Sequence, residues 1–445
     1  MPYVYSHQAL SGEGRAAKSL RTASVDDRSR WIHIQLNTFT NWSNEQLGRL
    51  GPPITDLGTD FSDGTRLIAL VEALQKRTCT GKIYRNNPSE IQMLMNVQMA
   101  LDALREDGVK LVNIGSHDIV EGNMKLILGL VWCLILRYQI ASRTKIPPRK
   151  LMLAWIQAVL PELKISNFRT NWNDGKALSA LLDYCQPGVF VHWRQLSSRD
   201  ALNNCRRALQ VAQAQFAIPQ VVSPEDLSSP DLDELSCMTY ISYFMKRDGP
   251  GYRATLNRVN QLIPEARVAD FQRTWNDGLA LCHLVHSVGG RIPGWPNLRF
   301  DPTQWMKNLH SGLMAAMELG LKPMITAKEM VEPDVEHLGV MVLAAELCGL
   351  PAVERSTRTH ASPSFDSEPN IEETSCHIHQ QVNLDLAFAD GHEVSLSDLD
   401  AVVVGPDGTR VDEQTVQLLK TLTIRGAVVS LVPPMPGPYE ASVAA

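Results

Sequence analysis

The chain has 445 residues, which at about 100–200 residues per domain predicts three or four folding units. Hydrophobic residues make up 44% of it and charged residues 20%, so apolar cores are possible and wholesale disorder is excluded. The formal net charge of −6 gives no general attraction to polyanions, so no nucleic-acid partner is expected.

Targeting and membrane signals are absent from the sequence. Its 8 cysteines include no C-x-x-C pair, and residues 1–20 lack the apolar core of a secretion signal, which favours a reducing cytosol. The longest apolar run, Leu126–Leu136, has 11 residues, whereas a membrane span needs about 20. This run therefore predicts a buried helix, and no transmembrane segment is expected.

The strongest pattern is a motif that occurs three times. FSDGTRLIALVEAL begins at Phe61, NWNDGKALSALLDYC at Asn171 and TWNDGLALCHLVHS at Thr274. Their aspartates lie 111 and 103 residues apart, which is the length of a domain and too long for a solenoid repeat. Each copy also ends in one apolar segment with the character of a helix, at 122–140, 231–245 and 334–350. Three related tandem domains are predicted.

Helical periodicity recurs inside each copy. Apolar residues at three- and four-residue spacing predict an opening helix in each, at Trp31–Phe39, Leu151–Leu160 and Leu256–Ile263. Asp-Gly begins a second helix, whose free N–H groups can be capped by Asp63, Asp174 or Asp277. Further helices near 96–105, 200–216 and 304–319 bring about four to each copy. The fold class is mainly all-α.

Spacing differs between the first two copies. Trp31 lies 32 residues before Asp63, whereas Trp155 lies 19 residues before Asp174. This difference predicts a 13-residue insertion around residues 44–59 of the first copy.

The sequence changes character after the third copy. Ser, Thr, Pro and Glu predominate after Leu350, a composition that cannot bury a core and predicts a flexible linker. From Val382 the alternation VNLDLAF and the turn residues of VGPDGT predict short antiparallel strands. About 64 residues remain there, fewer than the roughly 100 of an immunoglobulin-like sandwich. A partial β-sandwich is predicted.

The first two copies strongly resemble a tandem of calponin-homology domains. NTFTNW from Asn37, DFSDGTRLIALVEAL from Asp60 and GNMKLILGLVWCLILRY from Gly122 are similar to the first domain of actin-binding tandems. LAWIQAVLP from Leu153 and NFRTNWNDGKALSALLDYCQPG from Asn167 resemble the second domain in its filamin version. VGPDGT and VPPMPGPYEASV resemble a filamin-type immunoglobulin repeat without its final strand. The chain thus resembles a filamin-family actin-binding protein with three calponin-homology domains.

The expected domain boundaries follow from this resemblance. They are a disordered N-terminal extension at 1–27, calponin-homology domains at 28–141, 149–246 and 250–351, a flexible linker at 352–381 and a partial filamin-type immunoglobulin-like repeat at 382–445. The third domain departs from the pattern, because Arg258 stands at the position of Trp155. Its protein partner is left open.

The resemblance implies binding to the side of F-actin, and hence a place in the cytoplasmic actin cytoskeleton. In the family, the contacting surfaces are the opening and closing helices of the first domain and the opening helix of the second, here residues 31–42, 123–138 and 149–160. The candidate actin-binding residues in these segments are His33, Gln35, Asn37, Thr38, Asn41, Lys125, Leu128, Trp132, Arg149 and Lys150.

The apolar residues of the closing helix surround nearly its whole circumference. Either it is a core helix with every face buried, or one edge is covered by the second domain when the tandem is closed and by actin when it is open. Trp132 is the candidate edge, with Arg149 or Lys150 stacked on it as a cation–π latch of about 0.5–2 kcal/mol. By family analogy, Lys145, Arg149 and Lys150 are candidate phosphoinositide contacts.

Catalytic motifs are absent, so the chain is not expected to be an enzyme or to need a cofactor. There is no phosphate-binding Gly-rich loop, no nucleophile elbow and no H-E-x-x-H. Two groups have spacing that could hold a metal but lack a fourth ligand, so no metal site is predicted. These groups are Cys282, His283 and His286, and Cys376, His377 and His379.

Two functional classes remain open. The leading hypothesis is a cytoskeletal protein whose first two domains bind and organise actin filaments, while the third domain and the partial sandwich supply spacing or partner contacts. The alternative is a scaffold for signalling or membrane partners with little direct affinity for actin. Since one tandem binds one filament and bundling needs a second filament-binding site or a dimer, bundling is expected to be weak or absent.

Overall fold

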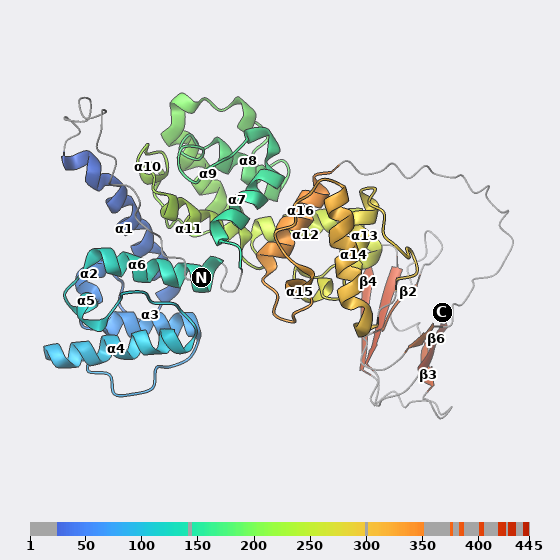
Figure 1. The fold of residues 1–445 in the computed structure, drawn as a ribbon, viewed down its shortest axis with the longest axis horizontal. Helices are drawn as coiled ribbons and strands as arrows, with labels where there is room; N and C mark the ends of the chain where they lie inside the picture. Colours follow the sequence, from blue (N-terminus) through green and yellow to red (C-terminus); the bar gives the residue numbers. More distant parts are fainter. Residues whose placement is uncertain are drawn as a thin grey trace. The chain divides into compact units, whose positions relative to one another are not determined.

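The computed structural model describes residues 25–140, 145–298 and 301–350, together with the backbone of six strands between residues 374 and 444. The chain divides into two units, Met1–Arg355 and Ser356–Ala445. All regular structure described in the first unit is helical, which confirms the mainly helical fold class (Figure 1). We refer to residues 25–140 as the first domain, 145–249 as the second and 250–350 as the third.

The first domain contains the four predicted long helices and two short ones. Its elements are α1 (Val25–Leu47), α2 (Leu57–Asp60), α3 (Thr65–Gln75), α4 (Glu90–Glu106), α5 (Ser116–Val120), α6 (Met124–Ile135) and the π-helical turn η1 (Leu136–Ile140). Helix α1 begins inside the segment predicted to be disordered, while residues 1–24 lie outside the described residues.

The second and third domains repeat this order. The second has α7 (Pro148–Val159), η2 (Pro161–Leu163), α8 (Lys176–Cys185), η3 (Trp193–Gln195), η4 (Ser198–Asp200), α9 (Ala201–Phe216), α10 (Pro224–Leu227) and α11 (Glu234–Met245). The third has α12 (Pro250–Leu262), η5 (Pro264–Ala266), η6 (Arg273–Trp275), α13 (Leu279–Ser287), η7 (Pro302–Gln304), α14 (Trp305–Glu318), α15 (Ala327–Met330) and α16 (His337–Cys348). Four-residue helices such as α10 are too short to show a hydrophobic period, so the sequence did not predict them.

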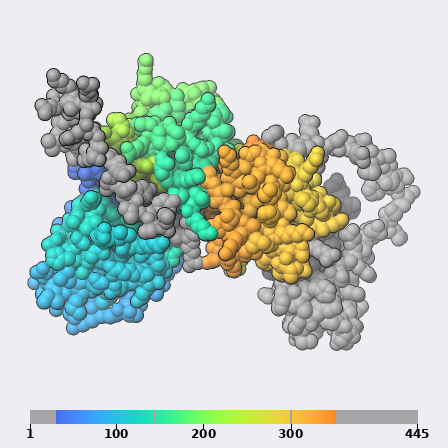
Figure 2. Space-filling model, viewed as in Figure 1, coloured from blue at the N-terminus to red at the C-terminus, as the bar shows by residue number. Residues whose placement is uncertain are grey.

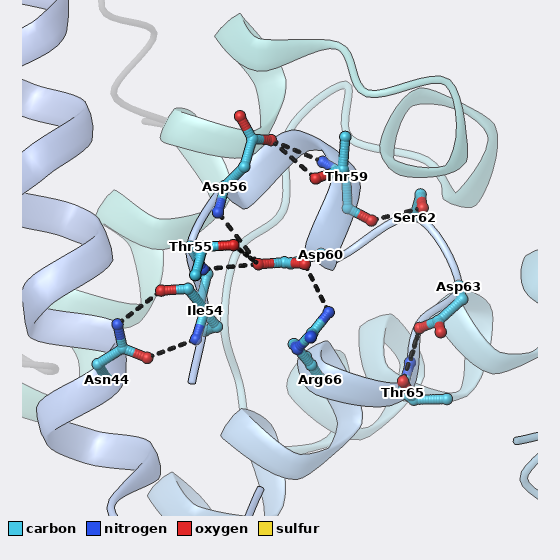
Figure 3. Close-up of polar contacts among 10 residues, drawn as sticks. All are labelled: Asn44, Ile54, Thr55, Asp56, Thr59, Asp60, Ser62, Asp63, Thr65 and Arg66. Carbon is cyan, nitrogen blue, oxygen red and sulfur yellow. Dashed lines mark hydrogen bonds and ion pairs between the residues drawn. The ribbon is translucent and has the colours of Figure 1, made fainter. Parts of the chain in front are cut away.

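The Asp-Gly motif forms the same helix start in every copy. In the first, the Asp63 carboxylate accepts a hydrogen bond of 2.7 Å from the Thr65 backbone N–H (Figure 3). The equivalent bonds are Lys176 N–H to Asp174 at 3.0 Å and Leu279 N–H to Asp277 at 2.9 Å. The predicted capping role of the three aspartates is confirmed.

The glycine of the motif is required by both conformation and space. Gly64, Gly175 and Gly278 have φ of +77°, +78° and +78°. A Cβ on Gly175 would lie 2.7 Å from Asn204 Cβ and 2.8 Å from the Cys205 backbone nitrogen. The close approach lets Asn204 Nδ2 donate to the Asp174 carbonyl at 3.0 Å, and the same bond recurs in the other copies. The motif therefore fastens α3 to α4, α8 to α9 and α13 to α14 in the three domains.

An amide side chain near the end of each opening helix identifies the equivalent residues. Asn44 Nδ2 donates to the Ile54 carbonyl at 2.8 Å (Figure 3), and Gln157 Nε2 donates to the Ile165 carbonyl at 2.7 Å. Trp155 is thus equivalent to Trp42 and not to Trp31.

The predicted 13-residue insertion is wrong as a consequence. Trp42 lies 21 residues before Asp63, while Trp155 lies 19 before Asp174, so the excess is two residues. The other additional residues lengthen the opening helix, which has 23 residues in α1 and 12 in α7. Exposed Trp31 lies in this extension, so it was the wrong tryptophan to align.

Asp60 anchors the connection between α1 and α3. Its carboxylate accepts from the Thr55 N–H at 2.6 Å and the Asp56 N–H at 3.0 Å, and it pairs with Arg66 (Figure 3). Burial opposes its charge, but these hydrogen bonds and the guanidinium outweigh burial and lower the pKa of Asp60. The connection is therefore held as an ordered segment.

The predicted buried helix at Leu126–Leu136 is confirmed as α6 and the first residue of η1. Ile127, Leu130, Val131 and Leu134 are fully buried. Among the helices that the structure describes, none is long and apolar enough to span a membrane.

The second unit contains antiparallel strand pairs. Its strands are β1 (Thr374–Cys376), β2 (Val382–Leu386), β3 (Asp400–Val404), β4 (Gln417–Thr423), β5 (Gly426–Val432) and β6 (Tyr439–Ala444). They form two sheets, in the orders β1-β6-β3 and β2-β5-β4. Strand β1 lies in the segment predicted to be a linker, because three residues carry no detectable alternation and only pairing with β6 defines them.

Candidate functional site

The candidate residues of α1 separate into an exposed row and a buried pair. His33, Asn37 and Asn41 are exposed and lie four residues apart, so they share one face of the helix. Gln35 and Thr38 are buried, with 6% and 0% of their surface exposed. The inclusion of Gln35 and Thr38 in an accessible surface is not supported, since the helical turn directs them inward.

The second domain contacts the exposed row. Asn37 Nδ2 donates to Asp226 Oδ2 at 3.3 Å, and Asn41 Nδ2 donates to the Val221 carbonyl at 3.2 Å. Both partners lie in or near α10. The Asn37 and Asn41 side chains are therefore engaged between domains, whereas exposed His33 lies one turn before Asn37.

The helices that meet between the first two domains carry buried polar groups without hydrogen-bond partners among the described residues. Helix α11 packs against α1 and η1. Within the described residues, the unpartnered atoms on these three elements include Thr38 Oγ1, Trp42 Nε1, Ser43 Oγ, Gln139 Nε2 and the Tyr240 hydroxyl. Each such group destabilises the buried state by about 1–3 kcal/mol relative to a paired one. Opening would allow water to satisfy those groups that lie at this contact.

Trp132 faces its own domain. Its ring stacks on Phe39, with 6.3 Å between ring centroids and an interplanar angle of 4°. Of the other closing-helix candidates, Lys125 is exposed and Leu128 is buried, with 8% of its surface accessible. Lys125 is thus the candidate on α6 that a partner can reach directly.

The predicted cation–π latch is wrong for this conformation. Arg149 Nε donates to Glu234 Oε1 at 2.7 Å, at the start of α11, and Lys150 is exposed. No cation lies over the Trp132 ring in the part of the chain that the structure describes. A carboxylate gives a guanidinium a charge-assisted hydrogen bond, which is stronger than contact with an aromatic face.

The candidate phosphoinositide cations have acidic neighbours from two domains. Lys145 Nζ lies 3.8 Å from Glu329 of the third domain, while Arg149 pairs with Glu234 of the second. Lys145 is largely exposed, so the pair adds little stability, but it places an acidic segment of the third domain beside α7.

The tryptophans of the first two opening helices differ in their polar environment. Trp42 and Trp155 are both fully buried. Trp42 Nε1 has no hydrogen-bond partner in the part of the chain that the structure describes, whereas Trp155 Nε1 donates to Thr255 Oγ1 at 3.1 Å. Thr255 belongs to the third domain, so the sequence offered no local signal for this contact across 100 residues.

This difference predicts unequal responses to the same substitution. Replacing Trp155 with Phe should destabilise its domain by about 1 kcal/mol more than Trp42→Phe destabilises the first domain, because only the former breaks a buried hydrogen bond. The ring volume removed is the same, so each variant is the control for the other. Hydrogen exchange in α8 and α3 measures the two effects, and equal losses of protection would contradict the prediction.

Histidines of the third domain pack on an aromatic ring. The ring of His283 meets the edge of Trp295 at 4.6 Å, and His286 stacks on it at 4.5 Å. Cys282 Sγ is buried and contacts the Asn308 carbonyl. Searched over the described residues, the chain has no group of three or more potential metal ligands. The side chains of Cys376, His377 and His379 lie outside the described residues.

The comparison with protein families identifies the class. The calponin homology (CH) domain model matches residues 33–140, 146–249 and 256–350, which together are well over half of the chain. The chain therefore belongs to the calponin-homology domain family. The three matches correspond to the three helical copies, each with one Asp-Gly motif.

Individual relatives include filamins. Filamin-C of Rattus norvegicus is 42% identical over 250 residues, which cover 54% of this chain and 9% of that protein. Filamin-A of Drosophila melanogaster is 41% identical over 229 residues, covering 48% of this chain and 10% of that protein. The chain thus spans about a tenth of the length of these relatives. The crystallised actin-crosslinking core of Schizosaccharomyces pombe fimbrin aligns with a TM-score of 0.40 and 18% identity, covering 70% of this chain and 73% of that one.

Proposed function

We propose that the chain binds the side of actin filaments through residues 28–246 and organises filaments in the cytoplasmic actin cytoskeleton. The observation that carries this proposal is the match of more than 40% identity to filamins over about half of the chain. It agrees with the resemblance of the first two domains to an actin-binding tandem. No catalytic role is proposed.

The interface between the first two domains supports the proposal that these domains can separate and expose an actin-contacting surface. It engages Asn37 and Asn41 in hydrogen bonds while their side chains stay partly exposed, and among the described residues several buried polar atoms on its helices have no hydrogen-bond partner. An interface of this kind is readily exchanged for another polar partner, because separation costs few satisfied hydrogen bonds. We therefore place the contact surface on His33, Asn37, Asn41, Lys125 and Lys150, while buried Gln35, Thr38 and Leu128 support it from behind.

High-speed co-sedimentation of the full chain with F-actin tests the proposal. The wild type should pellet with filaments. His33→Asp combined with Lys125→Glu should weaken binding about tenfold, because both side chains are exposed and the filament surface is acidic. Lys322→Glu, also exposed but in the third domain, is the matched charge control. Absence of pelleting by the wild type would contradict actin binding and favour the scaffold function. Pelleting of the double variant equal to that of the control would contradict the proposed surface.

For the second unit we propose a partial filamin-type immunoglobulin-like repeat at residues 382–445. Its support is the antiparallel pairing of the strands that the structure describes there, within two three-stranded sheets. With one tandem in the chain, we expect weak or absent bundling, and low-speed pelleting of filament bundles would contradict this.

A further inference from the structure

The opening helix of the second domain is enclosed along nearly its whole length. Among residues 148–159, only Lys150 and Gln157 are exposed. The equivalent helix of the third domain, α12, exposes twice as many side chains: Arg253, Asn257, Arg258 and Gln261. The difference arises because α16, the closing helix of the third domain, packs along α7. Figure 2 shows the second domain, in green, in contact with the third, in yellow and orange.

One hydroxyl of the third domain completes hydrogen bonds in the second. Thr255 Oγ1 donates to the Gly251 carbonyl at 2.8 Å and accepts from Trp155 Nε1 at 3.1 Å. The Tyr184 hydroxyl lies 3.0 Å away and must be its second donor, because the single proton of the threonine is already used. All three side chains are buried. Loss of this hydroxyl would leave two buried donors of the second domain unpaired.

Packing around this hydroxyl depends on two further residues of α12. Gly251 lies so close to the indole that a Cβ would be 2.5 Å from Trp155 Cη2. Arg258, at the position of the missing tryptophan, places its guanidinium 4.5 Å from the centre of the Tyr184 ring. The departure of the third domain from the sequence pattern is thus explained, since the arginine faces the second domain and not its own core.

The contact has an electrostatic component as well. A cavity of about 130 Å³ separates the start of α7 from the third domain and is lined by Lys145 and Leu151 on one side. The opposite side presents acidic residues, namely Glu329, Glu332, Asp334 and Glu336. Lys145 already lies 3.8 Å from Glu329. The third domain therefore offers α7 the same charge as an acidic filament surface.

A histidine joins the two closing helices. The buried His337, at the start of α16, has Nε2 2.9 Å from the Met245 carbonyl at the end of α11. Because a carbonyl only accepts, Nε2 carries the proton. The second and third domains are thus joined through their closing helices as well as at α7.

We propose that the third domain, by packing on α7 within the same chain, limits the access of actin to this helix. The proposal rests on the proposed function, in which the opening helix of the second domain is one of the three actin-contacting segments. The third domain would cover that segment with apolar packing from α16 and with an acidic rim. It would also complete the hydrogen bonds of Trp155 and Tyr184, so that covered α7 is the stable state.

The test uses the full chain with Thr255→Val and Arg258→Glu combined. Valine preserves the shape of threonine and removes the hydroxyl, and Arg258 is exposed, so the core of the third domain is left intact. Asn257→Ala, on the exposed face of the same helix, is the control. Amide hydrogen exchange of residues 148–159 reports whether the third domain is packed on α7, and co-sedimentation gives the affinity for F-actin. We expect faster exchange in α7, retained protection in α8 and α13, and an affinity for actin about three- to tenfold higher.

The possible outcomes separate this inference from the proposed function. Faster exchange in α7 with unchanged or weaker actin binding would overturn the inference and leave actin binding in place. Unchanged exchange in α7 would overturn the inference too, because the Thr255 and Arg258 contacts would then not keep the third domain packed on α7. Loss of protection throughout α8 would show that the third domain only stabilises the second. If neither the wild type nor the double variant pelleted with filaments, the proposed actin binding itself would be contradicted.

Discussion

Replacing Gly175 with alanine should lower the free energy of unfolding of the second domain by about 3 kcal/mol. Two effects add: a residue with a Cβ is strained by about 1–2 kcal/mol at positive φ, and the new Cβ would overlap the backbone of α9. The φ of Gly175 is +78°, and a Cβ at this position would lie 2.8 Å from the Cys205 nitrogen. Backbone atoms cannot rotate away, so α8 and α9 would have to separate. Urea denaturation followed by circular dichroism measures the loss.

Gly188→Ala is the matched control in the same domain. Its φ is +95°, yet no atom of the residues that the structure describes lies within 4 Å of the position that a Cβ would take. It should therefore cost only the conformational strain, about 1–2 kcal/mol. Equal losses at Gly188 and Gly175 would show that the contact with α9 does not matter, contrary to the role assigned to the Asp-Gly motif.

Replacing Glu346 with glutamine should stabilise the third domain at pH 8 by about 2 kcal/mol. Burial raises the pKa of Glu346, in the last turn of α16, from 4.5 to about 7, and no described residue gives its Oε2 atom a hydrogen-bond partner. Below pH 4.5 the carboxyl is protonated in both the folded and the unfolded state, so it imposes no penalty. Between pH 4.5 and 7 the unfolded state releases the proton first, so the stability of the wild type falls as pH rises. The expected size is reduced from the full linkage value because the side chain retains partial contact with water.

The pH dependence distinguishes this effect from a general gain in packing. Glu346→Gln and wild type should have the same stability near pH 4 and differ increasingly up to pH 8. Exposed Glu318→Gln, in α14 of the same domain, should match the wild type throughout. Thermal denaturation at a series of pH values provides the comparison. A stabilisation that is constant with pH would rule out the buried charge as its cause.

The second domain has two interdomain contacts of different character, one with the first domain at α10 and α11 and one with the third domain at α7. The first domain touches the second through hydrogen bonds from Asn37 and Asn41. The third domain instead contributes the buried Thr255 hydroxyl, which has hydrogen bonds to Trp155 and Tyr184, and a helix packed along α7. The contact with the third domain has the better-satisfied polar groups, so it should be the harder of the two to open.

The sequence by itself determined the three-domain helical architecture and the start of the second helix in each domain. These features are local. The Asp63 carboxylate accepts its capping bond from a backbone N–H only two residues further on. The positive φ of the next residue favours glycine whatever the rest of the chain does. The apolar period of α6 likewise follows from residues within one helix. Three repetitions of each pattern made them recognisable without a structure.

Only the tertiary structure decided which surfaces remain accessible. The alignment through Trp31 failed because that tryptophan is exposed in a helical extension, and the equivalence to Trp42 depends on a bond from Asn44 to Ile54. The latch failed because Arg149 met a carboxylate 85 residues away. Hydrogen bonds and packing between domains depend on side-chain positions that no local period specifies, so neither the buried state of Thr38 nor the enclosure of α7 could be derived from the order of residues along the chain.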